Sequence, residues 1–299
     1  MTTAVSLVIA TYNHARILPE ALASALAQTL PPEIVVVDDG STDDTPAVLA
    51  RYADRVRVLR VDHGGLAAAR NAGLAAVRGR FVAFLDADDL LDPDKLERQV
   101  AILEREPEIG WTYCDVRIED RAAEKTTTAS ARFDYAHRRL DGWIFPALVG
   151  GNVIPAMAPL VRRSLLERAG GFDPSLTSLE DWDLWLRLAL EAPARYSPDV
   201  LATYRIQAGG MSRNRARMDH ERFRALDKLG RARPDAIAAL GVPGRRLMAD
   251  VHNWFGYRAY AEADWHEARR RLAASLRLFP LQRRAPLMLG LAWLRGWAR

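Results

Sequence analysis

The stretch FVAFLDADD at residues 81–89 is an apolar segment that runs directly into three carboxylates. Phe81–Leu85 has the continuous apolar pattern of a buried parallel strand, and Asp86, Asp88 and Asp89 follow where such a strand leaves the sheet. Open α/β sheets bind ligands at the carboxyl ends of their strands. In an extended segment Asp86 and Asp88 point to the same side and can share one divalent cation. The alternative is a solvated acidic turn that leads into the next helix.

Strand-like and helix-like segments alternate around this stretch. The expected strands are Val5–Ala10, Ile34–Val37, Val56–Val61 and Phe81–Leu85, and helical spacing separates them. This order predicts an α/β fold, Rossmann-like, with a mostly parallel sheet and helices on both faces.

The following segments are less regular. We expect a strand pair within Ile109–Ile118, a loop over the active-site edge at Arg121–Arg139, a strand at Ala158–Val161 and a helix at Arg163–Ala169. Residues 215–299 show helical patterns and no strand pattern, which predicts an all-α C-terminal extension.

Composition narrows the class of protein. The chain has 299 residues, 49% of them hydrophobic and 27% charged, which is typical of a globular protein in water. Its single cysteine, Cys114, excludes a disulfide framework and a thiolate zinc site and fits a reducing cytoplasm. We see no basic signal-peptide region and no apolar run of the ~20 residues that span a bilayer. These features favour a cytoplasmic protein.

The charges are divided unevenly. Residues 1–204 hold 22 Lys and Arg against 30 Asp and Glu, a balance of −8, whereas residues 205–299 hold 20 against 8, a balance of +12. The two parts therefore have different electrostatic roles.

Several strand ends meet at one edge of the predicted sheet. Asp39 follows the second strand, Gly64-Gly65 follow the third, and Asp86 follows the fourth, so together they form a nucleotide crevice. Asp39 is our candidate for accepting a base N–H, with a local turn as the alternative. Arg70 is our candidate for a phosphate, with a surface ion pair as the alternative. No G-x-G-x-x-G follows the first strand and no P-loop motif occurs, which disfavours NAD and P-loop enzymes.

A second chemical cluster is SLEDWDLWLRLALE at residues 178–191. Ser178 is placed to cap a helix whose first turn carries Glu180, Asp181 and Asp183, and tryptophans form an apolar stripe. Acids at a helix N-terminus complement the helix dipole without any catalytic role. The functional alternative is a general base held by a rigid helix.

Together, these motifs resemble the family 2 glycosyltransferases of the GT-A fold, especially inverting enzymes of bacterial polysaccharide synthesis. The matching segments, in order, are SLVIATYNHARIL, IVVVDDGSTDDT, GGLAAARNAGL, FVAFLDADDLLDPDKLE, ERAGGFD, LEDWDLWLRL and the pair Tyr204-Arg205. They cover residues 4–213, so we assign the catalytic domain to residues 1–214 and the helical extension to residues 215–299. The resemblance implies transfer of a sugar from a nucleotide-diphosphate donor, usually a UDP-sugar, with inversion at the anomeric carbon.

The resemblance also implies roles for individual residues. The base pocket would be lined by Ala10, Thr11, Tyr12 and Asp39. Arg70 would approach the diphosphate, and Asp86 with Asp88 would be the DxD motif that holds Mn²⁺ or Mg²⁺. Asp181, preferred over Glu180, would be the catalytic base that takes the proton of the acceptor hydroxyl.

One position departs from the family pattern. The family commonly has a His two residues after the Tyr-Arg pair, where this chain has Gln207. Gln cannot act as an imidazole ligand, which puts a metal or phosphate contact in doubt, although Ser212 and Arg213 could still reach phosphate. A catalytically degenerate nucleotide-sugar scaffold or sensor is therefore the alternative function, and a nucleotidyltransferase is the enzymatic alternative.

The C-terminal extension carries its own signals. Gly256, Ala268, Leu272 and Pro280 have the offsets of one tetratricopeptide-like helical hairpin. The final stretch, LQRRAPLMLGLAWLRGWAR, is either a docked terminal helix or an interfacial helix that binds an anionic membrane surface. The second reading suits a lipid-linked or glycan acceptor at the inner face of the plasma membrane. No nucleic-acid recognition motif is present, so we expect no nucleic-acid partner.

Overall fold

The computed structural model describes residues 4–135, 140–207, 214–282 and 284–297. It divides into two compact units, residues 1–218 and 219–299. The boundary differs by four residues from the one expected from sequence, and α9 (Arg215–Ala232) begins in the first unit and continues into the second.

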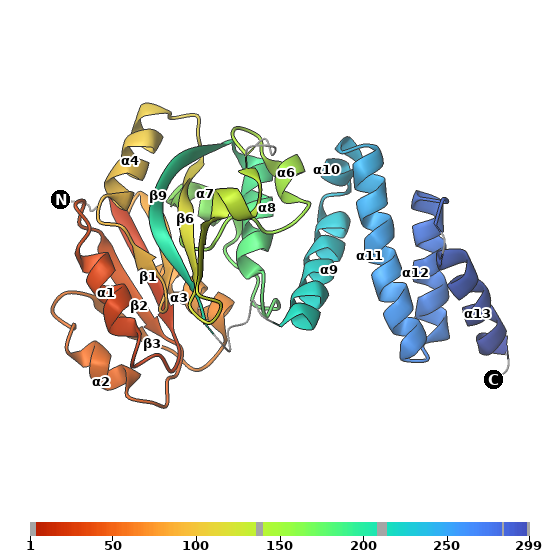
Figure 1. Ribbon diagram of the computed structural model, residues 1–299, viewed down its shortest axis with the longest axis horizontal. Helices are drawn as coiled ribbons and strands as arrows, with labels where there is room; N and C mark the ends of the chain where they lie inside the picture. Colours follow the sequence, from red (N-terminus) through yellow and green to blue (C-terminus); the bar gives the residue numbers. More distant parts are fainter. Residues whose placement is uncertain (1–3, 136–139, 208–213, 283, 298–299) are drawn as a thin grey trace. The chain divides into compact units, whose positions relative to one another are not determined.

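The first four strands form the parallel half of one sheet (Figure 1). They are β1 (Val5–Thr11), β2 (Glu33–Asp38), β3 (Arg57–Arg60) and β4 (Phe81–Asp86), in the order β3-β2-β1-β4 with every pairing parallel. The connecting helices are α1 (Leu18–Leu26), α2 (Thr45–Ala50) and α3 (Leu66–Ala76). The carboxyl ends of β1, β2 and β4 therefore lie at one edge, as the sequence predicts.

Small residues let α3 approach this sheet closely. A Cβ on Gly73 would lie 2.4 Å from Cγ1 of Val8 and 3.2 Å from Cγ2 of Val37, so no larger side chain fits between α3 and the first two strands. This close packing fixes the start of α3, where the Gly64-Gly65 turn meets the edge of the sheet.

The second half of the sheet is mixed. Its strands are β5 (Leu90–Leu91), β6 (Trp111–Asp120), β7 (Lys125–Thr128), β8 (Pro159–Arg162) and β9 (Ala194–Ile206). β8 pairs antiparallel with both β4 and β6, whereas β9 is parallel to β6. The parallel arrangement expected from sequence thus holds for the half formed by β1 to β4, and β8 joins this half to one of different topology.

Two expectations in this second half are wrong. Ile109–Ile118 does not contain a strand pair, because β6 continues as one strand to Asp120 and pairs with β7. The Arg121–Arg139 segment is not a loop throughout, since it contains β7 and α5 (Ala129–Arg132). We missed β7 because its threonines are polar. Threonine is β-branched and favours strands, but it does not produce an apolar pattern in the sequence. Residues 136–139 lie outside the described ranges.

Four helices complete the first unit around this half of the sheet. They are α4 (Lys95–Arg105), α6 (Phe145–Leu148), α7 (Arg163–Ala169) and α8 (Glu180–Glu191), and α7 spans the residues predicted. Trp182 and Trp185 of α8 are fully buried, and the Trp185 ring stacks 5.9 Å from that of Trp111. Ser178 is not the cap of α8: the N-cap is Leu179, with a left-handed φ of 61° and no side-chain cap hydrogen bond.

In its described part, the second unit is helical, as predicted. Its helices are the end of α9, then α10 (Pro234–Ala239), α11 (Val242–Ala261), α12 (Trp265–Leu278) and α13 (Ala285–Trp297). Gly256 of α11 packs on Leu272 of α12, where a Cβ would lie 2.8 Å from Leu272 Cγ. None of the helices within the described residues has the length and apolar character needed to cross a bilayer.

Candidate active site

The first two strand ends form a polar edge beside α3. Ala10 and Thr11 end β1 and are buried, and the following Tyr12 is partly exposed, with its ring 4.0 Å from that of His63. Asp39 directly follows β2, and its carboxylate accepts hydrogen bonds from the backbone N–H groups of Gly64 (2.8 Å) and Gly65 (2.9 Å). Asp39 therefore ties the end of β2 to the turn that opens α3.

The environment of Asp39 differs from the local turn considered from sequence. It is the neighbouring Asp38 whose Oδ1 accepts from the N–H of Ser41 at 2.9 Å. Oδ2 of Asp39 lies 2.8 Å from Nδ1 of His63, whose ring stacks on Tyr12. Tyr12, His63 and Asp39 thus form one contact cluster at the edge of the sheet.

Arg70 lies at the centre of the site and is buried. Its Nη2 donates to Asp86 Oδ1 at 2.5 Å and its Nη1 donates to Glu180 Oε1 at 2.7 Å. Burial alone lowers the pKa of Arg70, but the carboxylates of Asp86, Glu180 and Asp181 outweigh it and raise that pKa above its ordinary value. Arg70 is thus not the surface ion-pair residue considered from sequence; it links the end of β4 to the start of α8.

The DADD segment is a turn. β4 ends at Asp86, and the N–H of Asp89 donates to the carbonyl oxygen of Asp86 at 3.1 Å. The prediction that Asp86 and Asp88 lie in one extended segment is therefore wrong. Arg205 stabilises the turn because its side chain donates to the carbonyl of Asp88 and its N–H donates to Asp89 Oδ1 at 2.8 Å. The Tyr-Arg motif therefore has a structural contact with the acidic turn.

The carboxylates of this turn repel one another. Burial, and then the charge of Asp86, raise the pKa of Asp88. Burial, followed by the charges of Asp88 and Asp86, raises the pKa of Asp89 well above its usual range. Asp89 Oδ2 is buried and has no hydrogen-bond partner among the described residues. Such uncompensated carboxylates attract a cation.

These residues fit a divalent cation only in part. Within the described ranges, no three His, Cys, Asp or Glu side chains are grouped in a way that could hold a metal ion. Asp86 and Asp88 supply two carboxylates, and Mg²⁺-type ions commonly bind one or two protein carboxylates together with substrate phosphates and water. The residues thus fit a cation that is bound jointly with a diphosphate.

Asp181 has the properties of a general base. Nδ2 of Asn152 lies 3.1 Å from each of its carboxylate oxygens and donates to them, and the N–H of Trp182 donates to Oδ1 at 2.7 Å. Burial, and then repulsion by Glu180, raise the pKa of Asp181 to about 7, against the opposing effects of Arg70 and Asn152. A carboxylate with a pKa near neutrality can take a proton and release it again at physiological pH.

The helix that carries Asp181 is held rigidly. The indole N–H of Trp182 donates to the carbonyl of Leu148 at 2.9 Å, and that of Trp185 donates to the carbonyl of Ile154 at 3.2 Å. Both rings are fully buried, so the start of α8 cannot shift without breaking these bonds.

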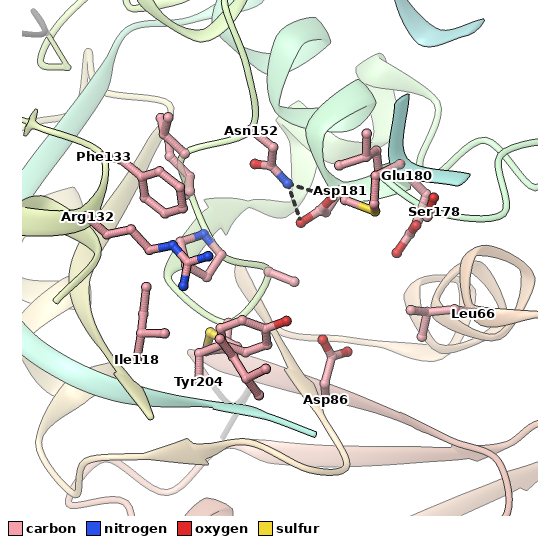
Figure 2. A pocket seen from close by; sticks show the side chains of 18 of the residues that line it. Leu66, Asp86, Ile118, Arg132, Phe133, Asn152, Ser178, Glu180, Asp181 and Tyr204 are labelled. Atoms are coloured by element: carbon pink, nitrogen blue, oxygen red, sulfur yellow. Dashed lines mark hydrogen bonds between the residues drawn. The ribbon is translucent and has the colours of Figure 1, made fainter. Parts of the chain in front are cut away.

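Arg70, Asp86 and Asp181 line one cavity of about 600 Å³. Figure 2 shows Asp86 and Asp181 in this cavity. Other side chains of its lining are Leu66, Ile118, Asp120, Arg132, Phe133, Asn152, Ser178, Glu180, Tyr204 and Arg215. The base-pocket candidates Ala10, Thr11, Tyr12 and Asp39, and the metal candidate Asp88, do not line this cavity. A separate surface hollow next to Asp39 is lined by Gly40 and residues 60–63.

Sequence reasoning missed several residues of the site. Asn152 lies just before the strand expected at Ala158–Val161 and was given no role from sequence, and Arg132 and Phe133 fell in the segment expected to be a loop. The short motifs give no signal for them, because they reach the cavity through tertiary contacts. Gln207 is exposed, and Ser212 and Arg213, considered for phosphate, lie outside the described residues.

Solved structures of known proteins share this fold. A fragment of S. aureus TarS, in complex with UDP-GlcNAc, matches with a TM-score of 0.63 and 18% identity, covering 97% of this chain and 87% of that one. The mannosyltransferase PcManGT from Pyrobaculum calidifontis, in complex with GDP-Man and Mn²⁺, matches with a TM-score of 0.61 and 23% identity, covering 98% and 84%. At these identities the likeness establishes a GT-A-like fold with a helical C-terminal region.

Sequence comparisons identify the family. An uncharacterised glycosyltransferase of Rickettsia prowazekii (strain Madrid E) is 32% identical over 206 residues, which cover 68% of this chain and 64% of that protein, so this chain spans just under two thirds of its length. The succinoglycan biosynthesis protein ExoU of Rhizobium meliloti (strain 1021) is 31% identical, covering 89% and 84%, and ExoO of the same organism is 37% identical, covering 72% and 64%. The sequence profile of "Glycosyl transferase family 2" matches residues 6–165, more than half of the chain. By these matches and the order of its motifs, the chain belongs to glycosyl transferase family 2.

Proposed function

We propose that this protein is an inverting, metal-dependent glycosyltransferase of the hexosyl-transferring type. It moves a sugar from a nucleotide-diphosphate donor to a hydroxyl group of a glycan or glycolipid. The observation that carries the proposal is Asp181, a carboxylate with a pKa of about 7 that is oriented by Asn152 in the cavity that also contains Asp86. The polysaccharide role is supported by the two relatives named as succinoglycan biosynthesis proteins.

In this mechanism Asp181 acts on the acceptor. Its carboxylate accepts the proton of the acceptor hydroxyl while that oxygen attacks the anomeric carbon from the face opposite the leaving diphosphate, which inverts the configuration. The hydrogen bonds from Asn152 and from the Trp182 N–H fix the direction of the carboxylate, so the proton is taken along one path. After transfer, the protonated Asp181 returns its proton to solvent near neutral pH.

The donor binds at the strand ends. We assign its base to Ala10, Thr11, Tyr12 and Asp39, and its diphosphate to the region of Arg70 and Asp86. Arg70 uses two of its five N–H donors for Asp86 and Glu180, so donors remain for a phosphate oxygen. A divalent cation, Mn²⁺ or Mg²⁺, held by Asp86 and Asp88, supplies neutralisation of the leaving diphosphate when it is bound. A UDP-sugar is our first choice, because the TarS fold neighbour was solved with UDP-GlcNAc.

The test is a calorimetric or thermal-shift titration of the whole chain with UDP, GDP, dTDP and CMP, each with and without Mn²⁺. We expect one nucleotide to bind tightly, and only with the cation. Lack of binding by every nucleotide in a folded sample would remove the donor assignment. Asp39→Asn tests base recognition. Asp54→Asn is the matched control for a general loss of charge, because Asp54 is exposed and lines neither cavity.

A nucleotide-sugar scaffold or sensor is the second candidate, and Gln207 is the observation that favours it. A scaffold binds the donor without turning it over. Nucleotide binding combined with no release of nucleotide from any donor sugar, in the presence of acceptor extracts, would decide for the scaffold.

We further propose that the protein works in the cytoplasm, at the inner face of the plasma membrane. In α13 and just before it, Leu281, Leu287, Trp293 and Leu294 are exposed, and residues 281–299 contain four arginines and no acidic residue. Trp and Arg favour a membrane interface, and anionic headgroups attract the arginines. Pelleting with anionic liposomes should fall when residues 281–299 are removed or when Leu287 and Leu294 are both replaced by Gln. Equal pelleting of all forms would exclude this role for α13.

A further inference from the structure

Arg132 supplies a free positive charge to the cavity. It ends α5 and lines the cavity, its guanidinium lies 5.7 Å from the ring centre of Phe133, and it forms no ion pair or hydrogen bond with any described residue. Arg70, in contrast, is buried and holds two carboxylates. An arginine that projects into a cavity without an anionic partner is free to bind an anion there.

The position of Arg132 assigns it to the acceptor, if the proposed function holds. Arg132, Phe133 and Ile118 line one side of the cavity, whereas Leu66 and Ser178 lie on the other side (Figure 2). The donor half is formed by the ends of β1, β2 and β4, of which Asp86 reaches the cavity. Arg132 comes instead from the segment after β7, on the far half of the sheet.

The neighbours of Arg132 fit a sugar ring. Phe133 is half-buried and Ile118 is buried, so together they give the cavity an apolar wall on which the C–H face of a pyranose can stack. The nearest acid of the lining in sequence, Asp120, accepts from the N–H of Ala123 at 3.1 Å. Arg132 is exposed, so a neutral acceptor would leave its charge paired only with solvent, whereas an anionic acceptor would bind it.

We propose that this wall is an acceptor subsite for an anionic glycan, in which Phe133 stacks on the sugar and Arg132 binds its negatively charged group. The group is either the carboxylate of an acidic sugar or the phosphate that joins a sugar to its carrier. Both offer the paired oxygens that a guanidinium binds with two parallel hydrogen bonds. Arg132 thus selects among acceptors, and Asp181 carries out the proton transfer on the one selected.

Binding of matched glycosides to the whole chain tests this proposal. The probes are methyl β-D-glucoside, methyl β-D-glucuronide and α-D-glucose 1-phosphate, measured by saturation-transfer NMR with wild type, Arg132→Gln and the control Arg121→Gln. Arg121 lies in the turn between β6 and β7, is exposed and does not line the cavity. A charge-assisted hydrogen bond is worth about 1.5–3 kcal/mol, so we expect roughly tenfold or more tighter binding of an anionic probe than of the neutral glucoside.

The variants decide the outcome. Arg132→Gln should remove this preference and Arg121→Gln should keep it; preference for the glucuronide points to an acidic sugar, and preference for the phosphate points to the carrier linkage. Equal binding of charged and neutral probes by wild type, or a preference that survives in Arg132→Gln, overturns the proposal. An Arg215→Gln variant reports whether Arg215, which also lines the cavity, binds the anion instead, which would also overturn the proposal. If the nucleotide titration fails while the anion preference stands, the proposed function falls and the anion site remains.

Discussion

Replacement of Asp181 by Asn should abolish turnover and, at the same pH, stabilise the protein. Asn has nearly the shape of Asp, and its carbonyl oxygen can still accept hydrogen bonds from Asn152 and from the N–H of Trp182. The change therefore removes the titrating carboxylate and leaves the packing of α8 in place. If Asp181 had a purely structural role at the helix N-terminus, its replacement by Asn would instead destabilise the protein, because the charge of Asp complements the helix dipole.

The size of both effects follows from the pKa. Loss of a general base typically lowers turnover by about 10²–10⁴-fold. The pKa of Asp181 is raised from 3.8 to about 7, so the folded state keeps its proton where the unfolded state has lost it, and stability decreases as pH rises from about 4 to 7. Such a shift corresponds to ~4 kcal/mol at full strength. Because Asp181 is partly exposed in the cavity, we expect about half, ~2 kcal/mol, as the gain of Asp181→Asn above pH 7.

Two assays give independent readouts. Turnover of wild type should rise with pH through about 7 with a slope of one, and urea unfolding at pH 5 and pH 8 should show a larger gain for Asp181→Asn at pH 8 than at pH 5. Asp54→Asn, at an exposed position, is the matched control and should change neither. Turnover above a tenth of wild type, or a destabilised variant at pH 8, would refute the reasoning.

Further perturbations test the rest of the site. Arg70→Met should destabilise the protein by about 3–5 kcal/mol in urea unfolding, because it leaves the buried carboxylate of Glu180 and the partly buried carboxylate of Asp86 without their cation; a loss below 1 kcal/mol would mean that the two ion pairs contribute little. Asp88→Asn should raise the Mn²⁺ concentration for half-maximal turnover by roughly tenfold or more, and an unchanged titration would remove Asp88 from the metal site. Gly73→Ala should lower the free energy of unfolding by about 1–3 kcal/mol, because the added Cβ would clash with Val8. A melting temperature equal to that of wild type would contradict the close packing of α3.

The predictable part of the fold is the part that rests on local pattern. The strands β1, β2 and β4 are continuous apolar runs buried on both faces, and polar residues follow each of them, with aspartates after β2 and β4, so sequence gives their order and their shared edge. β7 could not be found in this way, because its threonines stabilise a strand at the edge of the sheet without an apolar pattern. The length of β6 was missed for the same reason, since its final residues pair with β7.

The site was predictable only as separate pieces. Arg70, Asp86 and Asp181 were each found in a motif, but no spacing predicts that Arg70 bridges Asp86 and Glu180, which are 94 residues apart in the chain. That contact requires α3, β4 and α8 to converge, which is a property of the tertiary fold. Asn152 was missed because a single amide in a loop carries no periodicity.

The charged residues of this site fall into two groups: those that form ion pairs within the protein and stabilise the site, and those that have no ion pair and can bind a ligand. Arg70 pairs with acidic groups from two distant segments, and such pairs are costly to break once buried. Arg205 holds the acidic turn through its backbone N–H to Asp89 and pairs its guanidinium with Glu20. Asp88, Asp181 and Arg132 form no ion pair with any residue in the described part of the chain. Asp88 and Asp181 are partly buried, where an uncompensated charge lowers stability, whereas Arg132 is exposed. Unpaired charged side chains of this kind are expected at positions where a ligand binds them. Within our proposal these ligands are the cation with the diphosphate at Asp88, the acceptor hydroxyl at Asp181 and an anionic group of the acceptor at Arg132. Because each ligand binds the folded state, nucleotide with Mn²⁺ and anionic glycoside should raise the unfolding temperature additively.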